Sequence, residues 1–568
     1  MTDRPILFDR SANDRPKATL QDDLADLDGK LLYMLSKRSR LVQRAAKGKQ
    51  VLDREVEKKL WTSFEQAART HGLDQRLARQ LFALLGSFGL EIPEGRRSAD
   101  KPFVMVPRSE PADIDAAGPR SLAMTRMLCV IAAASGQAMR LTGVVLNDPL
   151  IELIKALNQT GARLSWTEDA VECKAAPDAK PATKLGQIAS EGDEPLLAFE
   201  EALIFCGDDA FTLYSLMALA LREAGRAKFA GGAELKMLDL RRLEAPLLHL
   251  GARLAGMNPR SRGVPVRLES GGRMASRIEL LPDTPALFAQ ALALAAWSYP
   301  QGLRIAPASS GQGEAQARAL DEALEALTLC QVKARKQGAE LIVPAGRPKL
   351  PAEPDLGLDP VLCAYLLALP VVAGGRCRLT GRPALPAEVL ADLKALGQEP
   401  EIGPGEAVLA AAPLNSAALS MGRRPEFLPL ALALAAKAAS QGKGTSLALP
   451  ASGEGAEAGL GTVALEILDR LGLAYAETDA GLDVQALEEG KRPAWDGVWT
   501  SPDAHTTLGL ALLSFLAPGV SIDNPGGLTA LWPRFWACYN ALPLVRDLKP
   551  APKEPEKDDK PKRRRVRV

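Results

Sequence analysis

The sequence predicts a chain of mixed class, in which an all-α bundle of three helices precedes a larger α/β part with a six-fold repeat. Three observations predict this division. Leucines recur at helical spacing through residues 20–95. Proline and glycine then interrupt the pattern within residues 96–113. Beyond them, an Ala/Leu-rich helix, a short strand, a turn and a second helix recur through residues 114–546.

Composition narrows the class of protein. The 568 residues carry 70 basic and 69 acidic side chains, with a mean hydropathy of −0.04. No apolar run is long enough to cross a membrane, and the first residues lack the apolar core of a secretory signal. The seven cysteines form no CxxC pair and there are three histidines, so no metal site is expected. We therefore expect a cytoplasmic protein, and the near-neutral charge argues against a nucleic-acid partner.

Both ends of the chain are expected to be disordered tails, at residues 1–19 and 547–568. The C-terminal tail is rich in proline and charge and has almost no apolar residues. Such a segment cannot bury enough surface to offset the entropy lost on ordering. Its basic run, Lys562 to Arg565, is compatible with RNA or an acidic partner, but a solvated tail is the simpler interpretation.

The helical module spans residues 20–95. Thr19 is a suitable N-cap, and a leucine stripe follows it to about Lys49. Two shorter helices are expected at residues 53–70 and 74–88, separated by a His-Gly stop. Because the first helix is longer than its neighbours and must cover its apolar stripe, we expect a homodimer through these helices.

The segment LADLDGKLLYMLSKRSRLV, followed by Lys49 and by Asp53-Arg54-Glu55, resembles the all-helical chorismate mutases. The resemblance implies a rearrangement of chorismate to prephenate without a cofactor, in which cations hold the two carboxylates and the ether oxygen. It implies that Arg38 binds a substrate carboxylate and that Lys49 reaches the ether oxygen. Glu55 would accept the substrate hydroxyl, and Arg54 would lie near the substrate.

The module departs from this family at several positions. The early arginine that the family contributes across the dimer falls on Gln21, and the loop between the first two helices is shorter. The third helix should supply a serine and, one turn later, a glutamine or glutamate. One register gives Gly89 and Pro93 and another gives Ser87 and Glu91, and the sequence leaves both open. The alternative is that the cations only solvate a helical hairpin.

The repeat of the larger part is clearest in three segments, residues 141–164, 229–254 and 377–402. Short strands beside Ala-rich helices suit helices packed closely against a sheet. A solenoid is the alternative, but the units vary in length and have no constant capping pattern. A Pro-containing break at residues 348–354 divides this part into two segments, 114–348 and 354–546.

The repeats, with GPRSLAMTRMLCVIAAASG and SPDAHTTLGLALLSFLAPGVSIDNPGGLTALWPRFW, resemble the enolpyruvyl transferases, in particular the 5-enolpyruvylshikimate-3-phosphate (EPSP) synthases. This resemblance implies two lobes of three βαβαββ-type units each, residues 114–348 and 354–546, with the active site between them. The substrates of that family, shikimate 3-phosphate and phosphoenolpyruvate, are both polyanions. Synthase and mutase act two steps apart in aromatic amino-acid biosynthesis.

In the first lobe, the resemblance can be followed residue by residue. Arg126 matches a family arginine, but the preceding lysine falls on Ser121, with Arg120 beside it. The glycine-rich turn reads GDDAFTLY and brings Asp208 and Asp209 to an anion-binding position. Three further family contacts are replaced, since its arginine, its Arg-Pro pair and its Ser-Ser-Gln fall on Tyr214, Leu238-Asp239 and Thr284-Pro285-Ala286.

The second lobe shows a similar loss of cations. Glu426 stands in place of the catalytic aspartate, and Glu457 keeps the place of a family glutamate. The lysine and arginine of Lys-Glu-x-x-Arg become Ala456 and Leu460, and the final lysine becomes Ala530. The family's Asp-His-Arg reads Asp503-Ala504-His505. Carboxylates without cationic partners would repel polyanions, and each lost phosphate contact costs about 1.5–3 kcal/mol.

Three functional hypotheses remain open from the sequence. The leading one is a shikimate-pathway fusion of a chorismate mutase with a synthase-like domain that has lost the parent transferase reaction. The second is a bifunctional mutase and enolpyruvyl transferase acting on a less anionic substrate. The third is a scaffold or regulatory protein in which both modules are degenerate. Chorismate and prephenate are the expected ligands, with no cofactor and no metal.

Overall fold

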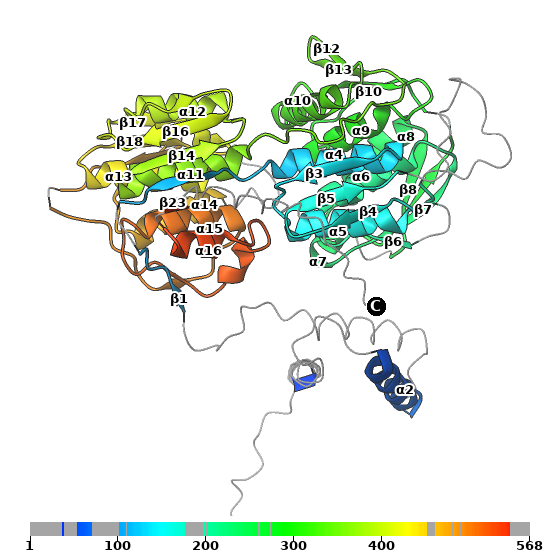
Figure 1. The fold of residues 1–568 in the computed structure, drawn as a ribbon, viewed down its shortest axis with the longest axis horizontal. Helices are drawn as coiled ribbons and strands as arrows, with labels where there is room; N and C mark the ends of the chain where they lie inside the picture. Colours follow the sequence, from blue (N-terminus) through cyan, green and yellow to red (C-terminus); the bar gives the residue numbers. More distant parts are fainter. Residues whose placement is uncertain are drawn as a thin grey trace, which may run out of the picture. The chain divides into compact units, whose positions relative to one another are not determined.

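The computed structural model describes Met34, Lys37, Arg38 and residues 54–70 near the N-terminus (Figure 1). Beyond these it describes residues 102–108, 111–175, 197–199, 203–258, 262–272, 274–450, 460–479, 481–488, 490–542 and 544–545. The chain divides into two compact units, Met1–Lys101 and Pro102–Val568. This division falls inside the predicted linker, residues 96–113.

The first unit contains the helix α2 (Arg54–Thr70), which has no glycine or proline. Ala68 is buried, Leu60 and Phe64 are half-buried, and Thr62 and Ser63 are exposed. This spacing places the apolar side chains on one face, as in an amphipathic helix. The bounds of α2 agree with the helix predicted at residues 53–70, and the other two predicted helices lie almost entirely outside the described residues.

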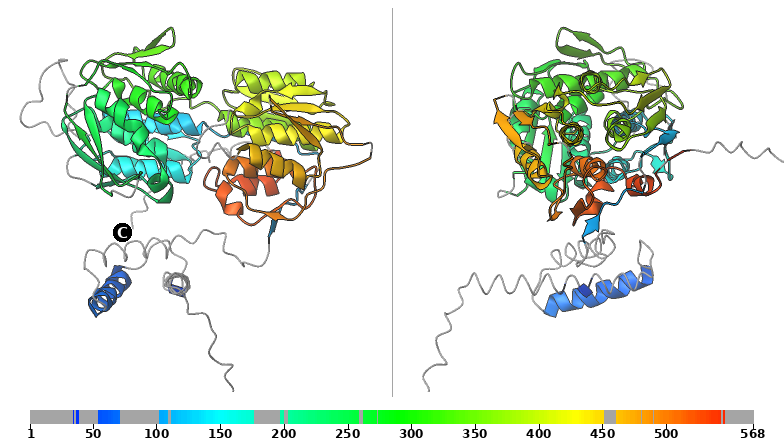
Figure 2. Two further views of the ribbon diagram at one scale, coloured as in Figure 1. Left: turned by 180° about the vertical axis from the view of Figure 1, so that it is seen from behind. Right: turned by 90° about the vertical axis from the view of Figure 1, so that its left-hand side faces the viewer.

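The second unit has two separate hydrophobic cores and six sheets among its described residues (Figure 2). We call the part around each core a lobe. The first lobe contains α4 (Leu122–Ser135), β3 (Met139–Thr142), α5 (Asp148–Gln159), β4 (Leu164–Trp166), β5 (Ala170–Cys173), β6 (Leu203–Phe205), α6 (Ala210–Ala220), β7 (Gly225–Ala230), α7 (Ala233–Met237), η1 (Leu240–Leu243), α8 (Glu244–His249), β8 (Ala252–Gly256), β9 (Val266–Ser270), β10 (Arg277–Glu279), α9 (Ala286–Ala296), β11 (Leu303–Ala306), α10 (Gly313–Leu329), β12 (Arg335–Gln337) and β13 (Glu340–Val343).

The second lobe holds the remaining elements of the unit. These are β1 (Phe103–Val104), β2 (Ile114–Ala117), α11 (Pro360–Ala373), β14 (Arg376–Thr380), α12 (Ala387–Ala395), β15 (Glu401–Ile402), β16 (Glu406–Ala410), β17 (Ala417–Leu419), η2 (Met421–Arg423), α13 (Leu428–Ser440), β18 (Thr445–Ala448), α14 (Leu460–Arg470), β19 (Tyr475–Thr478), β20 (Gly481–Val484), β21 (Val498–Trp499), α15 (Ala504–Leu513), β22 (Ser521–Ile522), η4 (Pro525–Leu528), α16 (Phe535–Asn540) and β23 (Leu544–Val545).

One βαβαββ plan recurs in these sheets. In the sheet β6-β7-β9-β8, the first two strands are parallel and joined through α6, and the last two form an antiparallel hairpin. The same order of strands occurs in β10-β11-β13-β12 and in β17-β18-β20-β19. It also occurs in β2-β14-β16-β15, to which β23 adds a further strand. The two three-stranded sheets, β3-β5-β4 and β1-β22-β21, contain parts of the plan.

Helices α4, α6, α9, α11, α13 and α15 form the centres of the two lobes. Apart from Arg126 of α4 and Lys437 of α13, they contain no Asp, Glu, Lys or Arg, and nearly all of α6 and α9 is buried. A helix that is apolar all round must be covered on every face. Frequent alanines let neighbouring helices approach one another closely. The sheets lie around these inner helices and cover them (Figure 2). The recurring Ala/Leu-rich segments of the sequence are therefore these buried helices.

The pairing of β1 and β2 shows that a predicted domain boundary was wrong. The sequence assigned the residues from 114 to the first lobe and treated residues 96–113 as a linker. In the structure, β2 pairs in parallel with β14 of the second lobe, and β1 within the predicted linker pairs with β22. Strands of two to four residues carry too little periodicity to reveal their partner. Their position is decided by backbone hydrogen bonds with distant parts of the chain.

The chain therefore crosses between the lobes twice, and the two crossing segments are hydrogen bonded to each other. The amide of Ser121 donates to the carbonyl oxygen of Gly357 at 3.1 Å, and the amide of Asp359 donates to that of Pro119 at 2.8 Å. These bonds fix the starts of α4 and α11 side by side. In the described part of the chain, no helix is both long and apolar enough to span a membrane.

Candidate functional site

The N-termini of the inner helices lie near one another. Arg126 of α4 pairs with Asp209 at the start of α6. In the second lobe, the hydroxyl of Tyr365 on α11 lies 3.0 Å from the carbonyl oxygen of Glu426 and 3.3 Å from that of His505. These two residues stand at the starts of α13 and α15. Because a helix N-terminus carries a partial positive charge, this arrangement is suited to anions unless the chain fills it.

At the start of α4, the structure places Arg120 and Ser121 beside the crossing segments. Ser121 caps the helix, since its hydroxyl accepts a hydrogen bond from the amide of Met124 at 3.1 Å. The guanidinium of Arg120 lies 3.4 Å from the carboxylate of Asp355, and its side chain is 33% exposed. Arg120 is the residue next to Ser121, where the resembling family has a lysine. It therefore already has a carboxylate partner.

The start of α6 is filled by Asp209. Its carboxylate accepts hydrogen bonds from the amide of Thr212 at 2.7 Å and from the Thr212 hydroxyl at 2.6 Å. The same carboxylate pairs with the guanidinium of Arg126, which also lies 4.4 Å from the centre of the Phe211 ring. One aspartate thus occupies the helix N-terminus and neutralises the neighbouring arginine.

Asp208 fills a second helix N-terminus in the same turn. Its carboxylate accepts from the amides of Glu234 and Leu235, at 3.0 and 3.4 Å, at the start of α7. Its own amide donates to the carboxylate of Glu152 at 3.0 Å. Gly207 precedes it with a φ of +64°, and a side chain there would meet Glu152 at 2.2 Å. The glycine-rich turn is therefore packed with carboxylates of the chain itself.

These carboxylates affect one another's protonation. Burial raises the pKa of Glu152, and the nearby charges of Asp209, Asp208 and Asp148 raise it further, while the hydrogen bond from the Asp208 amide opposes the shift. Like charges at short range disfavour a further negative group. A phosphate or carboxylate ligand would meet the same repulsion at this turn.

The other replaced positions of the first lobe hold neutral or acidic residues. Tyr214 is buried and packs edge-to-face on Phe288, with ring centres 5.8 Å apart. Asp239 binds Arg241 at 2.5 Å and lies 3.8 Å from Arg262, and the hydrogen bond from Arg241 holds the pKa of Asp239 low, at about 2. Thr284, of the segment Thr284-Pro285-Ala286, is fully buried.

In the second lobe, Glu426 lies in a network with an arginine that the sequence interpretation missed. The carboxylate of Glu426 accepts from Nε and Nη2 of Arg424 at 2.8 and 2.5 Å. Nη1 of Arg424 donates to Glu388 at 2.9 Å. The guanidinium also lies 4.8 Å from the centre of the Phe427 ring. Two carboxylates and an aromatic ring therefore surround this arginine.

Asp503 caps α15 in the same way as Asp209 caps α6. Its carboxylate accepts from the amide and the hydroxyl of Thr506, at 2.9 and 2.7 Å. The imidazole of His505 lies 3.9 Å from this carboxylate and its side chain is 33% exposed. Ala530 lies between η4 and α16 and offers no charge. Asp503 therefore caps the start of α15, with His505 as the second residue of the helix.

Asp359 is the central residue that sequence reasoning missed. Its carboxylate accepts from the amides of Val361 and Leu362 of α11, at 3.1 and 3.0 Å, and from the amide of Leu122 of α4 at 3.0 Å. It is 5% exposed, and burial raises its pKa while these amides lower it. The sequence signal was an Asp-Pro pair before an apolar run, which is typical of an N-cap.

The remaining predicted site residues divide into two groups. Arg54 and Glu55 are the first residues of α2, and Arg38 is helical, with a pKa lowered by burial. The described residues do not include Lys49, Ser87, Glu91, Glu457 or the Ala456 position. The predicted mutase site therefore stays a prediction, because several of its residues lie outside the described part of the chain. The structure does bring Arg126 together with Asp209, next to Asp208.

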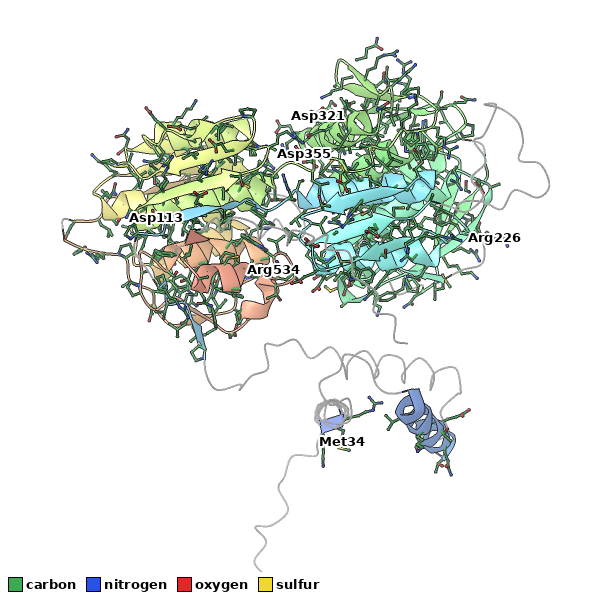
Figure 3. All side chains as sticks on the ribbon, in the orientation of Figure 1. Met34, Asp113, Arg226, Asp321, Asp355 and Arg534 are labelled. Carbon is green, nitrogen blue, oxygen red and sulfur yellow. The ribbon has the colours of Figure 1, made fainter. Side chains whose placement is uncertain are left out.

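The predicted loss of cations in the large part stays a prediction, and it concerns only the positions that the family resemblance marks. Arg120, Arg126, Arg241, Arg382 and Arg424 are all present near the helix starts or the crossing segments. Each has a carboxylate partner, which for Arg382 is both Asp355 at 3.1 Å and Glu325 at 3.4 Å. Figure 3 shows Asp355 between the lobes. The cations are therefore neutralised within the chain.

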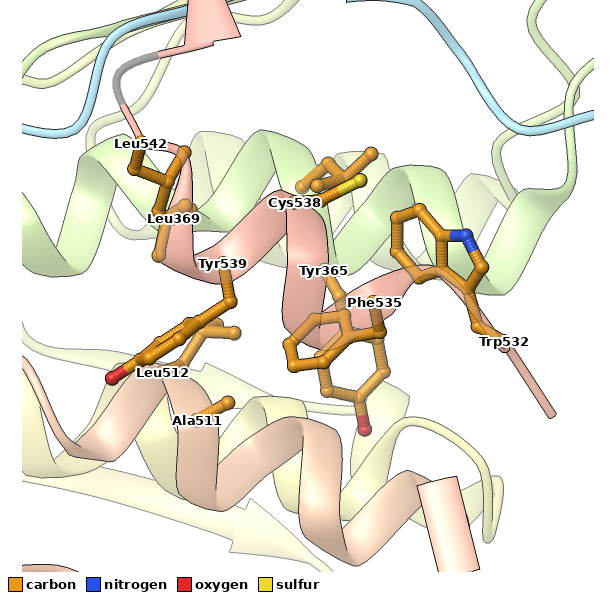
Figure 4. A pocket seen from close by; sticks show the side chains of 10 residues that line it. Tyr365, Leu369, Ala511, Leu512, Trp532, Phe535, Cys538, Tyr539 and Leu542 are labelled. Atoms are coloured by element: carbon orange, nitrogen blue, oxygen red, sulfur yellow. The ribbon is translucent and has the colours of Figure 1, made fainter. Parts of the chain in front are cut away.

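A small cavity of about 30 Å³ lies in the second lobe, among α11, α15 and α16 (Figure 4). Its walls are apolar and include Tyr365, Trp532, Phe535 and Tyr539. Trp532, Phe535 and Trp536 belong to this core, and the ring of Phe535 lies 5.5 Å from that of Trp532 and 5.1 Å from that of Trp536 between centres. The described residues contain no group of three or more His, Cys, Asp or Glu side chains placed to hold a metal ion.

Comparisons with known proteins identify the fold. No model of a protein family matches the sequence, and no curated protein matches it. A solved EPSP synthase from Acinetobacter baumannii aligns over 76% of this chain and 96% of its own, with a TM-score of 0.59 and 14% identity. A second EPSP synthase structure from that organism gives 0.58 and 15%, covering 77% of this chain and 97% of its own. The enolpyruvyl transferase NikO from Streptomyces tendae gives 0.53 and 14%, covering 74% and 93%.

The second unit therefore has the α/β fold of the EPSP synthases and other enolpyruvyl transferases. The structural neighbours leave the predicted chorismate mutase bundle unconfirmed.

Proposed function

We propose that the second unit belongs to aromatic amino-acid biosynthesis but does not carry out the EPSP synthase reaction. It would act as a ligand-binding or docking domain for an enzyme of that pathway. The fold supports the connection to the pathway. The start of α6 supports the loss of the parent reaction, because Asp208 and Asp209 fill two helix N-termini and Asp209 neutralises Arg126.

A phosphate-release assay tests this proposal directly. The full-length protein is incubated with phosphoenolpyruvate and shikimate 3-phosphate, and inorganic phosphate is measured. We expect no release above that of buffer, since each missing charge-assisted contact removes about 1.5–3 kcal/mol of binding. Phosphate release that is abolished by Glu426→Gln would instead support the alternative of a bifunctional mutase and enolpyruvyl transferase.

We propose a chorismate mutase function for the first unit as a second activity. It rests on the resemblance carried by Arg38, Lys49, Arg54 and Glu55, and on the helical conformation of the described residues among them. Arg54 and Glu55 are the first two residues of α2. The predicted homodimer through these helices, with chorismate and prephenate as ligands, belongs to the same proposal.

Loss of chorismate absorbance measures the mutase activity in the whole protein and in a truncated protein ending near Glu94. We expect turnover in both, and a large loss in Arg38→Ala because a carboxylate contact is removed. Lys59→Ala, an exposed cation on α2, is the control. Tight chorismate or prephenate binding without turnover would support the alternative of a scaffold or regulatory protein with both modules degenerate.

A further inference from the structure

The two lobes of the second unit touch at a place remote in sequence from the crossing segments. In the first lobe the contact involves the loop between β3 and α5, residues 143–147, and the turn between β4 and β5. In the second lobe it involves η4, α16 and the residues between them, 525–540. We call residues 525–540 the latch segment.

Three contacts join the latch segment or its surroundings to the first lobe. Val145 packs against the hydrophobic core of the second lobe. The side-chain amide of Asn147 donates to the carbonyl oxygen of Leu531 at 3.2 Å. The guanidinium of Arg534 pairs with the carboxylate of Glu168, and Figure 3 shows this arginine at the edge of the second lobe that faces the first.

Asn147 connects the two lobes through one rigid side chain. Its side-chain oxygen, Oδ1, accepts a hydrogen bond from the backbone amide of Leu150 at 3.1 Å and so caps α5 of its own lobe. Its side-chain nitrogen, Nδ2, donates to the carbonyl oxygen of Leu531 in the opposite lobe, and the residue is only 3% exposed. Opening the lobes here would leave its amino group without the Leu531 carbonyl and would expose Val145.

A separate ion pair joins the lobes beside the crossing segments. Arg382 of the second lobe lies 3.4 Å from Glu325 on α10 of the first lobe, and 3.1 Å from Asp355 on the crossing segment itself. The lobes are thus joined near the crossing segments and again at the latch segment.

We infer that the latch segment holds the two lobes in their observed contact. Asn147 supplies a buried hydrogen bond, Val145 supplies apolar packing, and the Arg534–Glu168 pair supplies an electrostatic contact at the rim. The inference does not depend on the proposed function, because it concerns the same residues whether or not the unit is an enzyme.

Hydrogen–deuterium exchange of the full-length protein tests the latch. The Asn147→Asp and Arg534→Ala double variant removes the interlobe donor and the interlobe cation. Aspartate is as good an N-cap as asparagine, so α5 keeps its cap. We expect the amides of residues 143–147 and 525–540 to exchange about fivefold faster, as loss of about 1 kcal/mol of local protection predicts. Exchange in α9, deep in the first lobe, should be unchanged.

Arg140→Ala is the matched control. Arg140 pairs with Glu172 at 3.7 Å within the first lobe, and its side chain is 55% exposed against 62% for Arg534. Unchanged exchange at residues 143–147 in the double variant, equal to that of this control, would overturn the inference. If α9 also exchanges faster, the first lobe itself has loosened. In that case the Arg534→Ala single variant decides, because it leaves Asn147 intact. Faster exchange at residues 143–147 in this variant supports the latch, and unchanged exchange rejects it.

Discussion

At the scale of single residues, the carboxylate of Asp209 has two kinds of partner. It bonds the Thr212 amide and hydroxyl and pairs with Arg126, so one side chain satisfies a helix N-terminus and a cation. An anionic ligand at this turn would have to displace that carboxylate. The charge of Arg126 is therefore withheld from a ligand by a neighbour in the fold.

Asp209→Asn should restore part of the lost anion affinity. Asparagine still caps α6, but it carries no charge to neutralise Arg126. We expect phosphoenolpyruvate to bind about tenfold more tightly than to the wild type, because a charge-assisted contact contributes about 1.5–3 kcal/mol. Isothermal titration calorimetry gives the affinity.

Asp503→Asn is the matched control for this substitution. Asp503 caps α15 through the amide and hydroxyl of Thr506, in the same pattern, and its carboxylate has no arginine partner among the described residues. Equal affinities of the two variants for phosphoenolpyruvate would show that Arg126 contributes nothing to anion binding.

Glu152→Gln should change the pH dependence of stability. Burial and neighbouring carboxylates raise the pKa of Glu152 in the folded protein. A carboxyl whose pKa is higher in the folded than in the unfolded protein stabilises the folded state at pH values below its unfolded pKa, which is about 4.3. This contribution to stability is lost as the pH rises through the folded pKa. Glutamine keeps an oxygen to accept from the Asp208 amide and never ionises. We therefore expect a higher Tm than the wild type at pH 7, and a difference that disappears near pH 4.

Thermal unfolding followed by circular dichroism at several pH values measures this difference. Glu399→Gln, at an exposed position beyond α12, is the control and should show no such trend. A constant Tm difference between Glu152→Gln and the wild type across this pH range would contradict the assigned cause.

At the scale of elements, the six inner helices depend on close packing between small side chains. In α9, Ala291, Ala293 and Ala295 are fully buried, and the helix packs against α6 and α10. A protein interior has no spare volume for added methyl groups. These alanines therefore set how closely the helices approach, which in turn sets where their N-termini lie.

Ala293→Leu should destabilise the first lobe by about 1–3 kcal/mol through overpacking. The free energy of unfolding, from urea titration, measures the effect. Ala123→Leu, on the exposed face of α4, adds the same atoms to a surface position and should change stability by less than about 0.5 kcal/mol. Similar losses in the two variants would show that helix propensity, and not packing, is being measured.

Sequence patterns identified these elements better than they identified the site. The Ala/Leu-rich runs predicted buried helices, the repeat predicted the α/β fold, and α2 was placed within one residue. The very short strands β1 and β2 were misassigned, because pairing across hundreds of residues leaves no local signal. The pairing of Arg424 with Glu388 and Glu426, and of Arg382 with Glu325, was likewise missed.

At the scale of the whole molecule, the chain consists of two compact units, and the second has its own two cores. A unit with its own core is expected to fold independently. Removing residues 1–101 should therefore leave the Tm of the second unit unchanged within about 1 °C, which is about the shift that a loss of 1 kcal/mol would cause in a unit of this size. Calorimetry of the truncated and whole proteins provides the comparison.

Sedimentation of the same two proteins tests the predicted dimer. If the helices of the first unit form the dimer, the truncated protein should be monomeric and the whole protein dimeric. A dimeric truncated protein would place the contact in the second unit, and a monomeric whole protein would remove the dimer from the mutase proposal.

The sequence alone determined that this chain has a helical N-terminal segment and a large repeated α/β part, because helix periodicity and buried apolar runs are local properties. Only the tertiary structure decided which lobe holds β1 and β2, which carboxylate neutralises each arginine, and how Asn147 joins the lobes. Those features depend on residues tens to hundreds of positions apart, whose charges and hydrogen bonds meet only after the helices have packed.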